Sequence, residues 1–175
     1  MKSNFDSCIN FTLEQEGGYQ CLHDDPGNWT GGVVGVGELK GTKYGISAAE
    51  YPHLDIPNLT RAQAIAIYHE DYWIPIDGDA LPLGADLVVF DFGVNAGTGE
   101  SARCLQSIVH VTQDGIIGPV TLNAVHAYTG DLVGALSTAH ESYYEGLADF
   151  PQFGQDWLRR VHLCETTAKA MIAHA

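Results

Sequence analysis

The sequence predicts a mainly α-helical fold with one short β or irregular region directly after the first helix. Three observations lead to this fold class. Apolar residues recur at helical spacing through most of the 175 residues. The segment 20–44 interrupts that pattern, because it is rich in Gly, Asp and Asn. A very apolar stretch at 82–95 predicts a buried central helix, so we expect two helical lobes that share a core.

The first helix is predicted from apolar spacing. Phe5, Ile9, Thr12 and Glu16 fall at i, i+4, i+7 and i+11, which places them on one stripe. Gly17-Gly18 is expected to end this helix, because glycine takes the left-handed conformation after a helix at little cost.

Glu16 therefore lies on or beside the apolar stripe, in the last turn of the helix. Burial and the negative end of the helix dipole both disfavour an ionised carboxylate there. A carboxylic acid kept neutral in this way can donate a proton near neutral pH. Spacing alone leaves a second interpretation open, in which Glu16 simply points to solvent near a helix end.

The segment after this helix carries turn signals. Asp24-Asp25-Pro26-Gly27-Asn28 has the residue types of a tight turn. Glycines alternate with β-branched residues over Thr30–Gly41, which predicts a small hairpin. A phosphate-binding loop is not expected there, because the glycines do not fit the GxGxxG spacing and no strand–helix unit surrounds them.

The later helices have recognisable start signals. Thr60-Arg61-Ala62-Gln63 reads as a capping box that opens a helix running to about Trp73. Gly118-Pro119 places proline at the first position of another helix. Further helices are expected over 100–110, 131–148 and 155–173.

The apolar helix at 82–95 contains two polar residues four positions apart, Asp91 and Asn95. They lie on one face of a helix that is otherwise buried, and buried polar groups need hydrogen-bond partners. They are either hydrogen-bonded core residues or a polar edge on the floor of a cleft.

The charge balance excludes some partners. With 22 acidic and 8 basic residues the net charge is −14, which argues against binding to nucleic acid. No stretch reaches roughly 18 apolar residues, so no membrane span is expected. The first residues show no apolar signal region, so we expect synthesis in the cytoplasm without a signal peptide.

The cysteines and histidines do not indicate a cofactor. The four cysteines, Cys8, Cys21, Cys104 and Cys164, form no CxxC pair, and free thiols are expected rather than disulfides in a reducing compartment. His69-Glu70-Asp71-Tyr72-Trp73 begins like a zinc-protease motif, but Trp73 stands where the second histidine is required. We therefore expect no metal and no other cofactor.

Several motifs resemble one family, and they occur in its order along nearly the whole chain. They are Glu16-Gly17-Gly18-Tyr19, Asp25-Pro26-Gly27, Thr42-Lys43-Tyr44-Gly45-Ile46, Tyr72-Trp73, Asp91–Gly97, Leu105-Gln106 and Asp114–Leu122. The sequence resembles glycoside hydrolase family 108, a group of lysozyme-like muramidases that includes phage endolysins and bacterial proteins labelled secretion activators. The resemblance implies a lysozyme-like fold.

The resemblance also implies an activity and a set of site residues. The activity is N-acetylmuramidase hydrolysis of the β-1,4 bond between N-acetylmuramic acid and N-acetylglucosamine in bacterial peptidoglycan. Glu16 takes the place of the catalytic acid. Asp25 is our choice for the second carboxylate, with Asp24 as its rival, and a solvated turn aspartate remains the alternative. Thr42 is expected to hold a water, unless it is an ordinary strand-edge residue; the sugar subsites are assigned to Tyr19, Tyr44 and Asn95.

The same resemblance divides the chain into two regions. Residues 1–96 correspond to the catalytic part and residues 97–175 to a helical peptidoglycan-binding region packed on it. The run Asn28–Gly41 is longer than the family pattern, which leaves the relative placement of Asp25 and Thr42 open. Two alternatives to hydrolysis stay open: a lytic transglycosylase, and a non-catalytic wall-binding or secretion-assisting protein. We expect a monomeric phage-type endolysin that reaches the wall through a holin or another release route.

Overall fold

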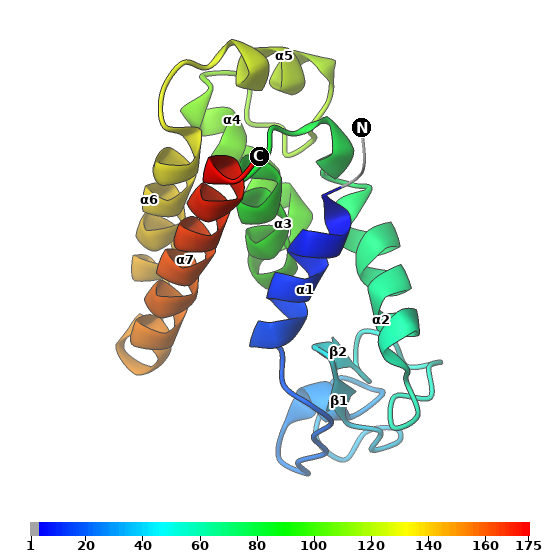
Figure 1. Cartoon of the computed structure of the whole chain (residues 1–175). Helices are drawn as coiled ribbons and strands as arrows, with labels where there is room; N and C mark the ends of the chain where they lie inside the picture. The colour runs from blue at the N-terminus through cyan, green and yellow to red at the C-terminus, as the bar shows by residue number, and fades with distance from the viewer. Residues whose placement is uncertain (1–3) are drawn as a thin grey trace. The chain divides into compact units, whose positions relative to one another are not determined.

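The computed structural model of the chain describes residues 4–175, and they form a mainly α-helical, lysozyme-like fold, as predicted (Figure 1). The α-helices within this range are α1 (Phe5–Gln15), α2 (Arg61–Tyr68), α3 (Ala85–Ala96), α4 (Thr98–Ile108), α5 (Pro119–Ala127), α6 (Leu132–Glu145) and α7 (Phe150–Ala173). The short elements are the 3-10 turns η1 (Pro26–Asn28) and η3 (Gly78–Ala80), the π-helical turn η2 (His69–Trp73), and the strands β1 (Thr42–Lys43) and β2 (Ile46–Ser47).

The chain divides into two compact units. One, the hairpin unit, is Ile9–Tyr68; the other, the helical unit, is His69–Ala175 with the described part of Met1–Cys8. This division does not follow the functional regions 1–96 and 97–175 expected from the sequence, because α3 packs with α4, α6 and α7 in a single unit. The assignment of a catalytic region and a binding region stays a prediction.

The core of the helical unit is built around α3. Every residue from Ala85 to Gly93 is buried, as the apolar composition of this helix predicted. Phe92 forms a core cluster with Tyr144 of α6 and Val161 of α7. Figure 1 shows α6 and α7 side by side, and their contacts hold them as an antiparallel pair against α3.

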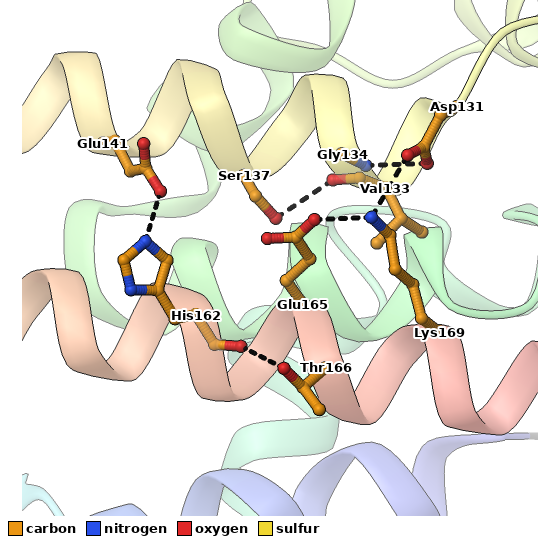
Figure 2. A network of polar contacts seen from close by, with 9 residues as sticks. All are labelled: Asp131, Val133, Gly134, Ser137, Glu141, His162, Glu165, Thr166 and Lys169. Atoms are coloured by element: carbon orange, nitrogen blue, oxygen red, sulfur yellow. Dashed lines mark hydrogen bonds and ion pairs between the residues drawn. The ribbon is translucent and has the colours of Figure 1, made fainter.

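Polar contacts join α6 to α7 along their exposed edge (Figure 2). His162 of α7 lies 2.7 Å from Glu141 of α6, and Lys169 pairs with both Glu165 at 2.6 Å and Asp131 at 3.2 Å. Asp131 also caps α6 by accepting from the backbone N–H of Gly134. The hydrogen bond from Gly134 and the ion pair with Lys169 lower the pKa of Asp131.

A buried ion pair ties α7 to α3. Arg160 donates through Nε to Asp91 Oδ2 at 3.0 Å and through Nη2 to Oδ1 at 2.8 Å, and the Asp91 side chain is only 6% exposed. Sequence reasoning expected a partner for Asp91 but did not identify Arg160. Asp91 is thus a satisfied core residue, which was one of the two interpretations left open for it.

The hairpin unit contains one regular hairpin. Strands β1 and β2 pair antiparallel with Thr42 opposite Ser47, and the connecting residues Tyr44 and Gly45 have φ values of 54° and 76°. Positive φ at both central residues is the type I′ turn that suits the twist of a two-residue hairpin. This hairpin lies after the segment Thr30–Gly41, where the sequence predicted one.

The predicted hairpin at Thr30–Gly41 forms only in part. The chain does turn back on itself, with Thr30 N–H donating to Glu38 O at 2.9 Å and an isolated bridge between Trp29 and Leu39. No regular strand forms within this segment. The alternation of glycine with valine leaves too few side chains to stabilise a ladder.

The helix starts marked by a capping box or a proline follow the sequence signals, whereas other boundaries differ. Helix α7 begins at Phe150 instead of 155, and α6 ends at Glu145 instead of 148. The capping box is confirmed, since Thr60 N–H donates to Gln63 Oε1 at 2.9 Å and Gln63 N–H donates to Thr60 Oγ1 at 3.3 Å. Pro119 begins α5, as expected. The left-handed glycine expected after α1 is wrong, because neither Gly17 nor Gly18 has a positive φ.

Two further expectations can be compared with the described residues. All four cysteines are free thiols, as predicted, with Cys8 and Cys164 buried. Burial raises the pKa of Cys104 to about 11 and raises that of Cys8 further, so neither thiol is a reactive thiolate near neutral pH. Over residues 4–175, no helix has the length and apolar character needed to cross a membrane.

Candidate active site

Glu16 lies directly after the last residue of α1 and continues its hydrogen bonding. Its backbone N–H donates to Thr12 O at 3.1 Å, and its side chain is partly buried. The carboxyl group rests against the turn of the β1–β2 hairpin. A Cβ added to Gly45 would lie 2.9 Å from Glu16 Oε2 and 3.1 Å from its Cδ. Glu16 therefore does not simply point to solvent.

Tyr68 holds the same turn from the end of α2. Its ring is buried, with 2% of the residue exposed, and its hydroxyl donates to the backbone carbonyl of Tyr44 at 2.8 Å. A Cβ on Gly45 would lie 2.5 Å from this hydroxyl oxygen. Sequence analysis placed this position within the helix that the capping box opens and did not identify Tyr68 as a neighbour of Glu16.

Asp25 anchors a turn. Its Oδ1 accepts from Gly27 N–H at 2.8 Å, which caps η1, and its Oδ2 accepts from Gln20 Nε2 at 3.0 Å. Both carboxylate oxygens therefore have partners within the hairpin unit. Its rival Asp24 is exposed. The structural role that the sequence left open for Asp25 is present, and its catalytic role stays a prediction.

Asn28 is the centre of a buried network that sequence reasoning missed. Its Oδ1 accepts from Gln20 Nε2 at 3.0 Å and from Thr42 Oγ1 at 2.8 Å, while its Nδ2 donates to Gln20 Oε1 at 2.8 Å and to Leu22 O at 3.0 Å. Its own carbonyl accepts from the backbone N–H groups of Lys40 and Gly41. Gln20 Nε2 also donates to Asp25, so the network links Thr42 to Asp25 through the side chains of Asn28 and Gln20.

The direction of each bond in this network is determined by groups that cannot exchange roles. Leu22 O can only accept, so Asn28 must present Nδ2 to it and Oδ1 to Thr42. Asp25 likewise forces Gln20 to donate through Nε2. The Thr42 hydroxyl therefore donates its only hydrogen bond to Asn28. Towards any further group this oxygen can act only as an acceptor. A water bound to Thr42 would donate to it.

Two of the predicted sugar-binding residues, Tyr19 and Tyr44, lie in different parts of the hairpin unit. Tyr19 is 46% exposed, and its hydroxyl donates to Lys40 O at 3.2 Å beside the segment Thr30–Gly41. A side-chain hydrogen bond with Cys21 raises the pKa of that hydroxyl. Tyr44 lies in the hairpin turn, with the Lys43 ammonium 5.7 Å from the centre of its ring. Both tyrosines belong to the hairpin unit with Glu16.

Asn95 belongs to the helical unit. It is exposed near the end of α3, and its Nδ2 donates to the backbone carbonyl of Asp91 at 2.6 Å. This local bond back to its own helix leaves the amide oxygen directed elsewhere. Its predicted contact with a sugar stays a prediction.

The second-half motif has a structural explanation. Gln106 of α4 is buried and donates through Nε2 to Asp114 Oδ1 at 2.7 Å and to Thr121 Oγ1 at 3.1 Å, while its Oε1 accepts from Gly115 N–H at 3.0 Å. The bond from Gln106 is the main cause that lowers the pKa of Asp114. One glutamine thus organises the loop before α5, beside which Ile116 is 69% exposed.

The chemistry available in the hairpin unit is that of oxygen donors and acceptors. A carboxyl group sits at a helix end against a glycine turn, with a second carboxylate and a threonine hydroxyl on one hydrogen-bonded loop. Among residues 4–175, His, Cys, Asp and Glu side chains form no group of three arranged to hold a metal ion. This combination suits proton transfer to a leaving oxygen and placement of a water.

Comparisons with known proteins found one matching family model and a similar solved structure. The sequence model described as Glycosyl hydrolase 108 matches residues 9–97. The structure of SagA from Brucella abortus is similar over 96% of this chain and 95% of that chain, with a TM-score of 0.80 and 32% sequence identity. A comparison with curated proteins returned no match.

Proposed function

Because the chain belongs to glycosyl hydrolase family 108, we propose that it is an N-acetylmuramidase with Glu16 as its catalytic acid. Its substrate is bacterial peptidoglycan, and the bond cleaved is the β-1,4 link from N-acetylmuramic acid to N-acetylglucosamine. The observation that supports this proposal is the close approach of the Glu16 carboxyl to Gly45, at the end of α1 and within the matched region 9–97.

The first chemical step is protonation of the leaving oxygen. Glu16 donates its proton to the glycosidic oxygen as the bond to C1 of the muramic acid breaks, and the sugar ring gains oxocarbenium-like charge. The N-acetylglucosamine product leaves with that proton on its O4. Proton donation by a positioned side chain contributes about 10²–10⁴-fold to such rates.

The second step places a water on C1. Thr42 is proposed to hold this water by accepting a hydrogen bond from it, because the Thr42 hydroxyl donates its own hydrogen bond to Asn28. Asp25 is proposed to take up the single proton that the water loses as its oxygen bonds to C1, or to stabilise the charged sugar. Tyr19 and Tyr44 are proposed to contact the sugar rings with their aromatic faces.

One variant tests the assignment directly. Glu16→Gln keeps the size of the side chain and removes its proton donor, so lysis of purified peptidoglycan should fall by about two to four orders of magnitude. Circular dichroism and thermal melting of the same variant check the fold. Turnover close to the wild-type rate in a folded Glu16→Gln protein would exclude Glu16 as the acid.

A lytic transglycosylase is the second candidate, and the bonds made by Asp25 favour it. Both oxygens of that carboxylate already accept hydrogen bonds from Gly27 and Gln20, so Glu16 is the carboxylate with the stronger claim to catalysis. A transglycosylase works with one Glu, and the 6-hydroxyl of the muramic acid replaces water. Product masses separate the two, since hydrolysis leaves reducing ends and transglycosylation leaves 1,6-anhydro ends.

We further propose that residues 97–175 supply wall affinity. The exposed Ile116 and Val120, at 69% and 71%, flank the loop that Gln106 organises. With a net charge of −14, the protein gains no long-range attraction to an anionic wall, so affinity must come from such short-range contacts. A non-catalytic role in wall binding or secretion would appear as sedimentation with peptidoglycan without release of muropeptides. Release to the wall through a holin or another route stays a prediction.

A further inference from the structure

Glu16 and Tyr68 approach one another across the place where Gly45 has no side chain. Glu16 Oε2 lies 2.9 Å and the Tyr68 hydroxyl oxygen 2.5 Å from the position that a Cβ on Gly45 would take. Both oxygens therefore surround one small space over the turn. Any other residue at position 45 would separate them.

The hydroxyl of Tyr68 has a fixed direction. A backbone carbonyl can only accept, so the 2.8 Å bond to Tyr44 O uses the single proton of this hydroxyl. The ring is buried at the end of α2, which keeps the hydroxyl in place. The bond crosses 24 positions of sequence and fastens the hairpin turn to the helix.

We propose that Tyr68 is a positioning residue for Glu16: it fastens the Tyr44–Gly45 turn against the Glu16 carboxyl, so that the carboxyl meets substrate in one fixed arrangement. This inference rests on the proposed function, because it assigns a role through the acid. A glutamate side chain has three rotatable bonds. When the fold already holds it in one arrangement, less conformational entropy is lost on reaching the transition state, so the barrier is lower. Tyr68 itself touches neither sugar nor water in this role.

Two substrates with different leaving groups distinguish a positioning role of Tyr68 at Glu16 from a role in the stability of the fold. Glycan chains need a proton on the departing oxygen, whereas a 2,4-dinitrophenyl group on a GlcNAc–MurNAc disaccharide departs without one. Loss of positioning at Glu16 slows only the first substrate. A loosened fold slows both.

The experiment compares Tyr68→Phe with wild type on both substrates, with Tyr51→Phe as the matched control in the same unit. We expect kcat on glycan chains to fall by about 10- to 100-fold with KM nearly unchanged, while kcat on the dinitrophenyl substrate stays within about twofold. Tyr51→Phe should retain wild-type values on both. Glu16→Gln serves as the reference for complete loss of the acid.

Each result decides one question. Equal losses of Tyr68→Phe on the two substrates, or no loss on either, would overturn the positioning role. Normal turnover of glycan chains by Glu16→Gln would instead overturn the proposed function, whatever Tyr68→Phe does. If Tyr68→Phe does not fold, Gly45→Ala tests the same contact from the turn, and it must show the same selective loss on glycan chains.

Discussion

Gly45 faces the carboxyl of Glu16 so closely that one added Cβ would lie 2.9 Å from Oε2. Real Cβ atoms do not approach neighbours this closely, and the φ of 76° at this position already disfavours a side chain. The hairpin turn can therefore pack this closely against Glu16 at the end of α1 only because residue 45 has no side chain.

Gly45→Ala should therefore reduce both activity and stability. The new methyl must push the carboxyl away, which we expect to lower kcat on peptidoglycan by about tenfold or more, and the positive φ should cost about 1–2 kcal/mol of unfolding free energy. Urea denaturation and muropeptide release measure the two effects. The control is Gly99→Ala, where a Cβ would meet only ordinary contacts at 3.7 Å, and it should match wild type in activity. Wild-type turnover by Gly45→Ala would show that the carboxyl is not held by this turn.

Asn28→Ala should destabilise the hairpin unit. Its buried side chain makes four partly buried hydrogen bonds, and their removal takes this partner from Gln20, Thr42 and Leu22. Each hydrogen bond contributes about 0.5–1.5 kcal/mol net, so we expect the loss of all four to cost at least about 2 kcal/mol. Asn28→Asp should also destabilise, because a carboxylate oxygen would face Leu22 O. A change below about 0.5 kcal/mol in chemical denaturation would contradict the network.

The pair of Asp91 and Arg160 should behave as a buried ion pair. Arg160→Met leaves the Asp91 carboxylate buried without its guanidinium, which we expect to cost about 3–5 kcal/mol. Adding Asp91→Asn to that variant should recover part of the loss, because the uncompensated charge is removed. The double-mutant cycle is measured by urea denaturation. Strictly additive losses would show that the two side chains do not act together.

His140 should make the helical unit sensitive to acid. Its ring stacks on Phe92 at 3.7 Å, its Nε2 is buried without a hydrogen-bond partner, and burial lowers its pKa from 6.5 to about 3. As the pH falls, His140 is protonated in the unfolded chain before it is protonated in the folded protein. The contribution of His140 to the free energy of unfolding is therefore fully present above about pH 6.5. It decreases by about 1.4 kcal/mol per pH unit as the pH falls towards 3.

His140→Phe keeps an aromatic ring against Phe92 and removes the titrating group. We expect similar stability at pH 7 and a higher melting temperature than wild type at pH 4. Burial raises the pKa of Asp86, whose contribution has the opposite sign, being complete at low pH and lost as the pH rises. Asp86 is present in both proteins, so the comparison cancels its effect. Parallel melting curves across pH 4–7 would show that His140 is not the acid-sensitive group.

We expect the loop before α5 and the start of that helix to contribute to peptidoglycan binding, independently of catalysis. Ile116→Ser combined with Val120→Ser removes two exposed apolar side chains, and burial of each on a wall would contribute roughly 1–3 kcal/mol. We expect weaker sedimentation with purified peptidoglycan and little change in thermal stability. Ile172→Ser, at another exposed apolar residue of the helical unit, is the matched control. Unchanged sedimentation by the double variant would place the affinity elsewhere.

The helices and their starts were predictable because their signals are local. Apolar spacing located α1 and the buried α3, and the residues Thr60 and Gln63 form the capping box that their spacing indicates. Such features depend on side chains three or four positions apart, which are neighbours on any helix. The position of Glu16 at the end of α1 follows from the same local pattern.

By itself the sequence determined the helical class, the order of elements, the family resemblance and Glu16 as the candidate acid. Only the tertiary structure decided that Gly45 and Tyr68 meet beside that acid, that Asn28 orients Thr42, and that Arg160 pairs with Asp91 across 69 positions. These contacts form when loops close and helices pack, so no periodicity or spacing along the chain records them.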